Sequence, residues 1–405
     1  MDLDFSPMLR FPEYRELDSY TPYRFDDIFT FSSGKNIKQS EASPEFEIPC
    51  VRYGELYHLY GEVITRVVNN TNLERSDLKF SHGDEVLLPS AGEDPLDIGS
   101  ASALTLKNIA IGRTINVLRP KGTVKYSPIY VSFYINEKLK RKISTLARGA
   151  SISNVYNSDL KGLRITLPAI EEQQKIADFL SAVDEKIRLL KEKHALLQQY
   201  KKGMMQKLFS QEIRFKDDNN QAFPDWKVES LGKWVIEHKE TSKQENEFEV
   251  MTSSRKGLVR QSDYYGEGRI TERSNKGFNV IPNSFLTYRS RSDDRQFFFN
   301  LNEFGYTGII STYYPVFTMS NGNNTFFKEL SRVHRHMFGR VAVGTSQVVL
   351  SFNELKKIKL SLPCDAEQRK IEQFAKALDN KINALNHQID LTQTFKKGLL
   401  QKMFV

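Results

Sequence analysis

Two long segments of the chain carry apolar residues at alternating steps of four and three, the spacing of one face of a helix. Each segment begins just after a proline, Pro168 or Pro363, and contains no further proline. The pattern predicts two helices of about 39 residues, each about 58 Å long at about 1.5 Å per residue. The apolar positions form a heptad seam: Ile176, Leu180, Val183, Ile187, Leu190 and Leu197 in the first segment, and Ile371, Leu378, Ile382, Leu385, Ile389 and Leu399 in the second.

The two segments are copies of one another. Residues 167–209 and 362–404 align without a gap at a separation of 195, and 20 of the 43 aligned positions are identical. The phrase YKKGMMQKLF at the end of the first becomes FKKGLLQKMF at the end of the second. The register extends upstream, where Gly149 matches Gly344 and Ser151 matches Ser346. The chain is therefore a tandem duplication of a globule followed by a helical arm.

Such a stripe is either a face packed on its own globule or a seam between the two arms. Two matched stripes favour mutual pairing, and the short connections around the second globule then make the arms antiparallel. This predicts an antiparallel coiled coil, pseudo-two-fold and nearly circular, with the C-terminal residues close to the N-terminal segment. Four polar residues interrupt the seam and either fix its register or serve a partner: His194, Lys201, Thr392 and Lys396.

Outside the arms the pattern predicts mixed short strands and helices, which makes the fold α+β. Strands are expected in residues 45–57, 84–89, 113–120, 248–254, 284–290, 296–300 and 308–317, and basic helices in 137–149 and 329–340. We expect four parts: a globular domain at 1–166, the central arm at 167–214, a second globule at 215–361 and the C-terminal arm at 362–405. The globules share short matched segments at their ends but not their interior sequences, which suggests one helical scaffold that carries two different recognition surfaces.

Composition narrows the class of protein. Net charge is +8 and the isoelectric point is about 9.1, which makes a polyanionic partner plausible. Only two cysteines are present, Cys50 and Cys364, which indicates a reducing compartment. The first residues lack a signal peptide, and no apolar run approaches the roughly 18 residues of a membrane span. We therefore expect a cytoplasmic protein without a membrane contact.

Sequence motifs for catalysis are missing. The chain has no phosphate-binding loop, no N-P-P-[YF] tetrad of an amino-methyltransferase and no glycine-rich cofactor loop after a strand. His334 and His336 lack further metal ligands at a suitable spacing. Asp184-Glu185-Lys186 resembles a fragment of a nuclease motif, but its place in the arm predicts a solvated helix face. We expect neither a catalytic site nor a metal site in this chain.

The arm motifs resemble a known family. An L-P-x-x-x-E-Q start followed by a long helix that ends in K-K-G-[ML]-[ML]-Q-K-[LM]-F, written twice, is similar to the specificity subunit (HsdS) of type I restriction–modification enzymes. Residues 9–14, 48–57 and 250–258 also resemble phrases of such subunits. The likeness covers essentially the whole chain.

The resemblance implies a division of labour. Each globule would be a target recognition domain that reads one half of a split, non-palindromic DNA sequence in double-stranded DNA. The paired arms would measure the spacer and dock two methyltransferase (HsdM) subunits, through which nuclease/translocase (HsdR) subunits join. S-adenosylmethionine, ATP and magnesium would belong to those partners, and this chain would be non-catalytic by itself. The alternatives are a duplicated scaffold that binds protein, a DNA-binding regulator that acts without HsdM, and a chain with its own nuclease or methyltransferase activity.

No base-contacting residue transfers by motif, so candidates come from side-chain chemistry. Arginine, lysine, asparagine and glutamine read base edges, while arginine, lysine and serine also bind phosphates. Arg289, Arg291 and Arg295 are the strongest candidates because they follow a strand in a polar loop. The glycines before Ser151 and Ser346 indicate either a close approach to phosphate or a structural turn. The full set is Arg113, Lys121, Lys125, Arg148, Ser151 and Asn154 in the first globule, and Arg255, Lys256, Arg289, Arg291, Arg295, Arg332, Arg335 and Ser346 in the second.

Overall fold

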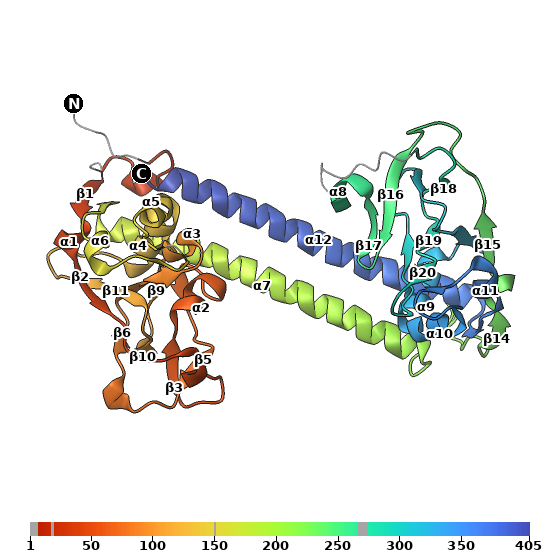
Figure 1. Ribbon diagram of the computed structural model, residues 1–405, viewed down its shortest axis with the longest axis horizontal. Helices are drawn as coiled ribbons and strands as arrows, with labels where there is room; N and C mark the ends of the chain where they lie inside the picture. Colours follow the sequence, from red (N-terminus) through yellow and green to blue (C-terminus); the bar gives the residue numbers. More distant parts are fainter. Residues whose placement is uncertain (1–6, 18–19, 150, 266–273) are drawn as a thin grey trace. The chain divides into compact units, whose positions relative to one another are not determined.

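The computed structural model describes residues 7–17, 20–149, 151–265 and 274–405. It divides into two compact units: unit 1 is Met1–Lys191 with Gln388–Val405, and unit 2 is Glu192–His387. Both boundaries fall inside the long helices α7 (Ile170–Phe209) and α12 (Asp365–Met403). The two predicted arm helices are confirmed, at 40 and 39 residues. Each unit therefore consists of one globule, one end of α7 and one end of α12 (Figure 1).

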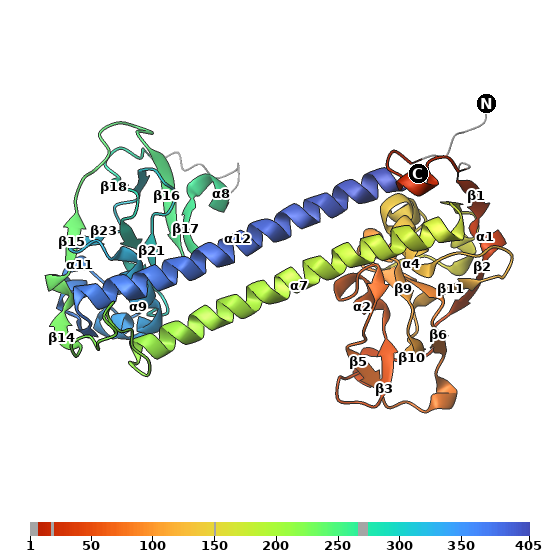
Figure 2. The same cartoon turned by 180° about the vertical axis from the view of Figure 1, so that it is seen from behind.

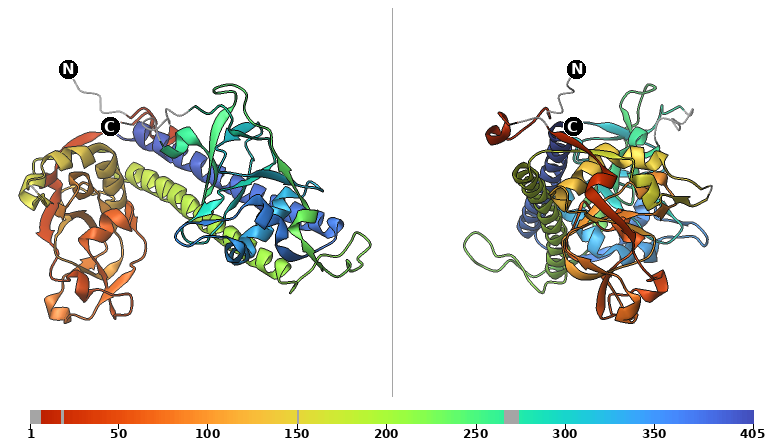
Figure 3. Two further views of the ribbon diagram at one scale, coloured as in Figure 1. Left: turned by 45° about the vertical axis from the view of Figure 1, so that its right-hand side comes forward. Right: turned by 90° about the vertical axis from the view of Figure 1, so that its left-hand side faces the viewer.

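The globule of unit 1 contains two main sheets. The larger has the strand order β2-β11-β7-β9-β4 and the smaller the order β5-β3-β10-β6. Figure 3 shows the smaller sheet at one end of this unit and the short helices at the other. The described residues of this unit also form the two-stranded pairs β1-β13 and β12-β8. The strands are β1 (Thr21–Arg24), β2 (Phe29–Ser33), β3 (Ile48–Val51), β4 (Val63–Ile64), β5 (Asn69–Thr71), β6 (Phe80–His82), β7 (Glu85–Pro89), β8 (Ala91–Gly92), β9 (Ser102–Leu104), β10 (Lys107–Ile111), β11 (Ile115–Pro120), β12 (Ser153–Asn154) and β13 (Arg164–Leu167).

Short helices cover the larger sheet of unit 1 and share its core with the arms. Tyr130 and Phe133 of α4 are fully buried, in one cluster with Ile176 and Leu180 of α7 and Phe404 after α12. The helices are α1 (Phe25–Ile28), α2 (Tyr53–His58), α3 (Pro95–Ile98), α4 (Pro128–Tyr134), a π-helical turn (Ile135–Leu139), α5 (Lys140–Thr145) and α6 (Asn157–Leu160), with 3-10 turns at Pro12–Tyr14, Gln39–Glu41 and Arg75–Asp77.

Unit 2 repeats this plan. Its two main sheets have the orders β15-β23-β19-β21 and β17-β16-β22-β18, with pairs β14-β25 and β20-β24. Figure 2 shows the second of these sheets at one end of the unit and α9 and α11 at the other. The strands are β14 (Lys227–Ser230), β15 (Val235–His238), β16 (Glu249–Ser254), β17 (Gly257–Arg260), β18 (Asn279–Ile281), β19 (Leu286–Tyr288), β20 (Arg291–Ser292), β21 (Phe299–Leu301), β22 (Gly308–Ile310), β23 (Val316–Met319), β24 (Val348–Val349) and β25 (Lys359–Leu362); the helices are α8 (Gln261–Tyr265), α9 (Asn324–Val333), α10 (Arg335–Val341) and α11 (Phe352–Lys357), with a 3-10 turn at Leu231–Lys233.

The interiors of the two globules differ in sequence yet share a strand register. In unit 1, β3 pairs in parallel with β10 (Val51 with Ile111), and in unit 2 β16 pairs in parallel with β22 (Met251 with Ile310). The backbone N–H of Ser90 donates to Thr114 (2.9 Å), and that of Ser290 donates to Tyr313 (3.3 Å). The duplication therefore includes the globules, although the sequence reveals it only in the arms and landmarks.

Several predicted elements were wrong in extent, among them the strand expected at 296–300, which is found at Phe299–Leu301. The expected strand at 45–57 is a strand only over Ile48–Val51, because α2 follows. The expected strand at 308–317 is two strands joined by a turn at Thr312–Tyr313. The expected helix at 329–340 is two helices that meet at His334, whose ψ of 23° leaves the helical region. Each of these errors comes from extending one local pattern across the boundary between two elements.

The L-P-x-x-x-E-Q motif joins each arm to its globule. Glu172 is fully buried and accepts hydrogen bonds from Arg10 (2.7 and 2.8 Å) and from the Tyr20 hydroxyl (2.9 Å). Its copy, Glu367, accepts from Arg214 (2.8 and 3.1 Å) and from the indole of Trp226 (3.0 Å). These charge-assisted hydrogen bonds offset the cost of burying the carboxylate and join it to residues outside the helix. The glutamate therefore fixes the start of each arm on its globule.

Two of the seam-breaking lysines have the same role at the other end of each arm. Lys201 of unit 2 donates to Asp379 (2.7 Å) and to Glu329 of α9 (2.7 Å). Lys396 of unit 1 pairs with Asp184 (2.7 Å) and with Glu62 of the globule (3.2 Å). Asp184, expected on a solvated face, is thus half-buried in an ion pair, and burial raises its pKa although Lys396 opposes the shift.

The seam is buried at most positions. In each unit the arm ends share a core with the globule. In unit 1, α7 begins at the globule where α12 ends, so the two helices run in opposite directions. Leu9 donates its N–H to the carbonyl of Lys402 (2.8 Å), which confirms that the C-terminal residues return to the N-terminal segment. Nine of the twelve predicted seam residues are buried, and Leu190, Leu197 and Ile382 are half-buried.

Candidate nucleic-acid interface

In unit 2 a basic face is formed where β19 ends and β20 pairs with β24. Arg289 and Arg291 are exposed and line two adjoining hollows of about 450 and 570 Å³. Arg291 lies over the ring of Tyr313, with its guanidinium carbon 4.6 Å from the ring centre. Arg255 and Lys256, at the β16–β17 turn, line the larger hollow as well. We call this surface, defined by Arg255, Lys256, Arg289, Arg291 and Tyr313, the reading surface.

Among the described residues, one ion pair engages the reading surface, although Asp263 and Asp293 also line the larger hollow. Arg255 pairs with Asp294 at 2.7 Å, and the hydroxyl of Ser292, with the N–H of Gln296 and Arg255 itself, lowers the pKa of that carboxyl. Within the residues that the structure describes, Arg289 and Lys256 have no carboxylate within ion-pair distance. Arginine donors held by a scaffold and left free of carboxylates are suited to base edges and phosphates.

Arg295, one of the three strongest candidates, has a structural role instead. Its guanidinium donates to the carbonyls of Gly339 (3.4 Å), Ala342 (3.4 Å) and Gly344 (3.1 Å). Its φ of 58° lies in the left-handed region, and a Cβ at Gly339 would meet its carbonyl oxygen at 2.2 Å. Arg295 therefore holds the loop that carries Arg291 against α10, and a contact between Arg295 and DNA stays a prediction.

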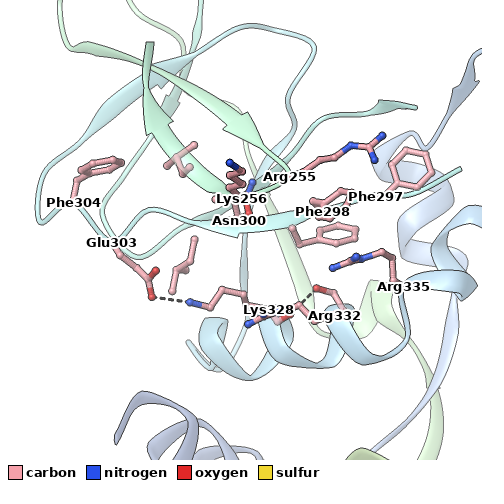
Figure 4. A pocket seen from close by; sticks show the side chains of 15 residues that line it. Arg255, Lys256, Phe297, Phe298, Asn300, Glu303, Phe304, Lys328, Arg332 and Arg335 are labelled. Atoms are coloured by element: carbon pink, nitrogen blue, oxygen red, sulfur yellow. Dashed lines mark hydrogen bonds and ion pairs between the residues drawn. The ribbon is translucent and has the colours of Figure 1, made fainter. Parts of the chain in front are cut away.

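A second group of candidates in unit 2 surrounds a neighbouring cavity of about 390 Å³, which Figure 4 shows. Arg332 and Arg335 come from the end of α9 and the start of α10, and Arg255 and Lys256 reach the same cavity from the β16–β17 turn. The cavity and the reading surface thus share two basic residues. We call it the phenylalanine cavity, after Phe298 on its wall.

In unit 1 the candidates are divided between two places. Arg113 lies in the turn before β11, close to Lys35, because the loop at 34–37 packs on that turn: Arg113 donates its N–H to Asn36 (2.7 Å) and Lys35 to Ile111 (2.9 Å). Arg148 and Asn154 lie at the same edge of the globule. Asn154 precedes Val155, whose backbone N–H donates to the carbonyl of Ser90. The backbone N–H of Ser90 in turn donates to Thr114, the residue after Arg113. Arg148 also approaches Asp159 at 3.5 Å.

Lys121 and Lys125 follow the opposite end of β11, a strand of 6 residues that is about 20 Å long at about 3.3 Å per residue. Lys121 is also engaged by the carbonyl of Asp26 (2.9 Å). The structure therefore does not bring these two lysines to the edge that holds Arg113 and Arg148.

The matched glycines before Ser151 and Ser346 are explained by the turn itself. A Cβ at Gly149 would lie 2.0 Å from the Ile152 carbonyl, and at Gly344 2.5 Å from the Gln347 carbonyl. Both glycines have φ above 130°. The close approach of the backbone to itself requires glycine at both positions, so a structural turn accounts for Gly149 and Gly344. Ser151 and Ser346 are exposed beside these turns, and Ala150 lies outside the described residues.

Sequence reasoning missed four residues of these candidate surfaces, three in unit 2 and one in unit 1. Phe298 and Tyr313 support the guanidinium groups, Lys328 lines the phenylalanine cavity, and Lys35 stands beside Arg113. Phe298 could have been found by alternation, since its neighbours Phe297 and Phe299 are buried and it points to the other face. The other three depend on contacts between distant segments.

The described residues contain no group of three histidine, cysteine or acidic side chains arranged to hold a metal ion. Nor, in the same residues, does any helix have the length and apolar character that crossing a bilayer requires.

Comparisons with known proteins agree with this architecture. The solved S subunit of a type I restriction-modification system from M. genitalium covers 99% of the chain with a TM-score of 0.60 at 17% identity. Another type I R-M structure covers 95% with a TM-score of 0.50 at 14% identity. At these identities the likeness concerns the fold alone.

Among curated proteins, a putative type I restriction enzyme MjaX specificity subunit of Methanocaldococcus jannaschii is 34% identical over 30% of each chain. The StySPI specificity subunit of Salmonella potsdam is 22% identical over 52% of this chain and 47% of its own. The matches thus span less than half of the length of these two relatives. The model of the type I restriction modification DNA specificity domain matches residues 18–199 and again 225–392, most of the chain. The chain therefore belongs to the type I restriction–modification DNA specificity family and carries its domain twice.

Proposed function

We propose that this chain is the DNA-reading subunit of a type I restriction–modification complex, and that each globule reads one half of a split, non-palindromic target. The observation that carries the proposal is a difference at equivalent positions of the two globules. Unit 2 presents Arg289 and Arg291 around Ser290, where unit 1 has Pro89 and Ala91 around Ser90. One backbone plan with different side chains at the same edge is suited to two different half-sites.

The side chains of the reading surface suit a major groove. A guanidinium group donates two parallel hydrogen bonds to O6 and N7 of guanine, and each good pair contributes about 1–3 kcal/mol of discrimination. Tyr313 holds Arg291 in place, which lowers the entropy lost when that side chain binds. In unit 1, Arg113 and Lys35 supply the basic groups at the equivalent edge.

The arms offer a surface for two copies of a partner. Leu196 and Tyr200 of α7 are 58% and 50% exposed, and their copies Leu391 and Phe395 of α12 are 57% and 54% exposed. The members of each pair are four residues apart and therefore lie on one helix face. Exposed apolar groups at matched places favour docking of two methyltransferase (HsdM) subunits, with nuclease/translocase (HsdR) subunits joining through them. S-adenosylmethionine, ATP and magnesium then belong to those subunits.

Co-purification with an N-P-P-[YF] methyltransferase tests the assignment. We expect the pair to methylate DNA with S-adenosylmethionine, and the purified chain alone to show no turnover with S-adenosylmethionine or with ATP and magnesium. Leu196→Glu and Leu391→Glu should each reduce the bound methyltransferase from two copies to one. Methylation or cleavage by the chain after rigorous removal of partners, or specific DNA binding that no methyltransferase affects, would contradict the proposal and favour an enzyme or a regulator.

A further inference from the structure

The phenylalanine cavity collects more positive charge than it neutralises. Five basic side chains line it: Arg255, Lys256, Lys328, Arg332 and Arg335. Lys328 is engaged by Glu303 at 2.8 Å, and Arg332 approaches Glu329 at 3.4 Å. Glu329 is itself held by Lys201, so its charge is shared. Lys256 and Arg335 have no carboxylate partner among the described residues.

Arg335 is the least satisfied of the five. Its guanidinium lies 4.0 Å from the centre of the Phe298 ring, and its Nε is buried without a hydrogen-bond partner in the described structure. Burial, followed by the positive charges of Arg332 and Arg255, lowers the pKa of Arg335. A buried donor without an acceptor costs about 1–3 kcal/mol, and more when it is charged. An anion in the cavity would remove that cost.

The shape of the cavity decides which anion fits. The guanidinium groups of Arg255 and Arg335 both lie over the Phe298 ring, at 5.6 and 4.0 Å, so the ring is already engaged by two cations and is a poor platform for a stacked base. The charged groups on the wall are donors, apart from Glu303, which Lys328 already engages. A phosphodiester has acceptor oxygens, no donors and a negative charge, so it matches this set of cations, whereas a base edge is uncharged.

The position of the cavity links it to the DNA. Arg255, Lys256 and Phe298 line both this cavity and the larger hollow of the reading surface. Figure 4 shows Lys328 and Arg332 on the helix below the cavity, with Arg255 and Lys256 above it. A strand that presents its bases to Arg289 and Arg291 can therefore place a nearby phosphate between these two walls.

We propose that the phenylalanine cavity binds a backbone phosphate of the DNA beside the half-site that unit 2 reads, with Arg335 and Lys256 as its ligands. The inference rests on the proposed function and adds a separation of roles to it. Arg289 and Arg291 select the sequence, while Arg335 and Lys256 supply affinity and position. Phosphate contacts fix the register of a protein on its duplex without carrying sequence information.

The test measures binding of the chain with its methyltransferase to a cognate and to a random duplex over a range of salt concentrations. Arg335→Met keeps the stack on Phe298 apolar, and Lys256→Ala removes an exposed lysine whose loss cannot unfold the globule. Arg340→Met, an exposed arginine of α10 outside the cavity, is the matched control. We expect each cavity variant to lower the affinity for the cognate and the random duplex equally, on the order of tenfold at low salt.

The salt dependence gives the sharper readout. Loss of one phosphate contact reduces the slope of log K against log salt by about 0.9, and Arg340→Met leaves it unchanged. The methylated sequence should stay the same in every variant. Affinity and slope equal to the control for both cavity variants, or a changed target sequence, would overturn the phosphate assignment. A parent complex that does not prefer the cognate duplex would instead overturn the proposed function.

Discussion

Replacing Lys201 by methionine tests the account of how each arm is fixed to its globule. Lys201 occupies a seam position, yet it is buried between Asp379 and Glu329, both at 2.7 Å. The exposed fractions of the Lys201 and Glu329 side chains are 7% and 3%. Removing the lysine leaves Glu329 as a buried carboxylate with only the more distant Arg332 beside it. Breaking a buried pair in this way costs about 3–5 kcal/mol.

The duplication supplies a matched control, Lys396→Met. Lys396 is 16% exposed, and its partners Glu62 and Asp184 are 22% and 34% exposed, so the groups left behind retain more contact with water. We expect this change to destabilise unit 1 by only about 1–2 kcal/mol. A third variant, Lys201→Met with Glu329→Leu and Asp379→Leu, should recover much of the loss, because apolar replacement of a whole buried network is often neutral.

The two units can be followed separately during denaturation. The chain has two tryptophans, Trp226 and Trp234, and both belong to unit 2. Their fluorescence in urea reports the unfolding free energy of unit 2, while far-ultraviolet circular dichroism reports both units. Lys201→Met should lower the tryptophan-detected midpoint and Lys396→Met should leave it nearly unchanged. A loss below about 1 kcal/mol in unit 2, or equal losses for the two variants, would refute the burial argument.

Three other changes address the reading surface, the spacer and pH. Arg289→Ala or Arg291→Ala should relax the sequence preference of one half-site, at about 1–3 kcal/mol each, whereas unchanged methylation patterns would place the base contacts elsewhere. Inserting one heptad between Glu185 and Leu197 keeps the seam in phase and adds about 10 Å, so methylated-site sequencing should find a spacer longer by at most about three base pairs; an active variant with the old spacer would show that the arms do not measure DNA. Burial lowers the pKa of Lys396, but Glu62 and Asp184 outweigh it and the net pKa is raised above 10.5. The stability that Lys396 contributes is therefore present below about pH 10.5 and is lost as the pH rises through the raised pKa. The difference in unfolding free energy between the parent chain and Lys396→Met should be constant between about pH 7 and 9 and shrink above about pH 10.5. A difference that shrinks between about pH 7 and 9 would contradict the assignment.

The arms were predictable because their signal is local. A heptad stripe, a proline before each helix and an ungapped copy 195 residues away require no knowledge of tertiary contacts. The same pattern exposed Lys201 and Lys396 as exceptions, with register or a partner as the two alternatives. One of the two partners of each lysine, Glu329 or Glu62, comes from the globule, and such a contact between distant segments has no periodic signature.

The candidate site was predictable only in part. Arg289 and Arg291 lie where a polar loop follows a strand, and the structure leaves them exposed there. Arg295 follows the same local rule but is engaged by three carbonyls near α10, because the loop turns back in a left-handed conformation. Local sequence indicates that an arginine is near the surface, but not which backbone groups its donors meet.

The central claim is that two globules on one mount read two different half-sites, and mapping of methylated DNA tests it most directly. The complex of this chain with its methyltransferase is compared with one in which residues 215–361 are exchanged for those of another family member. The account predicts a split, non-palindromic target of which the exchange alters one half and leaves the other half unchanged. A palindromic target, or a change in both halves, would contradict it.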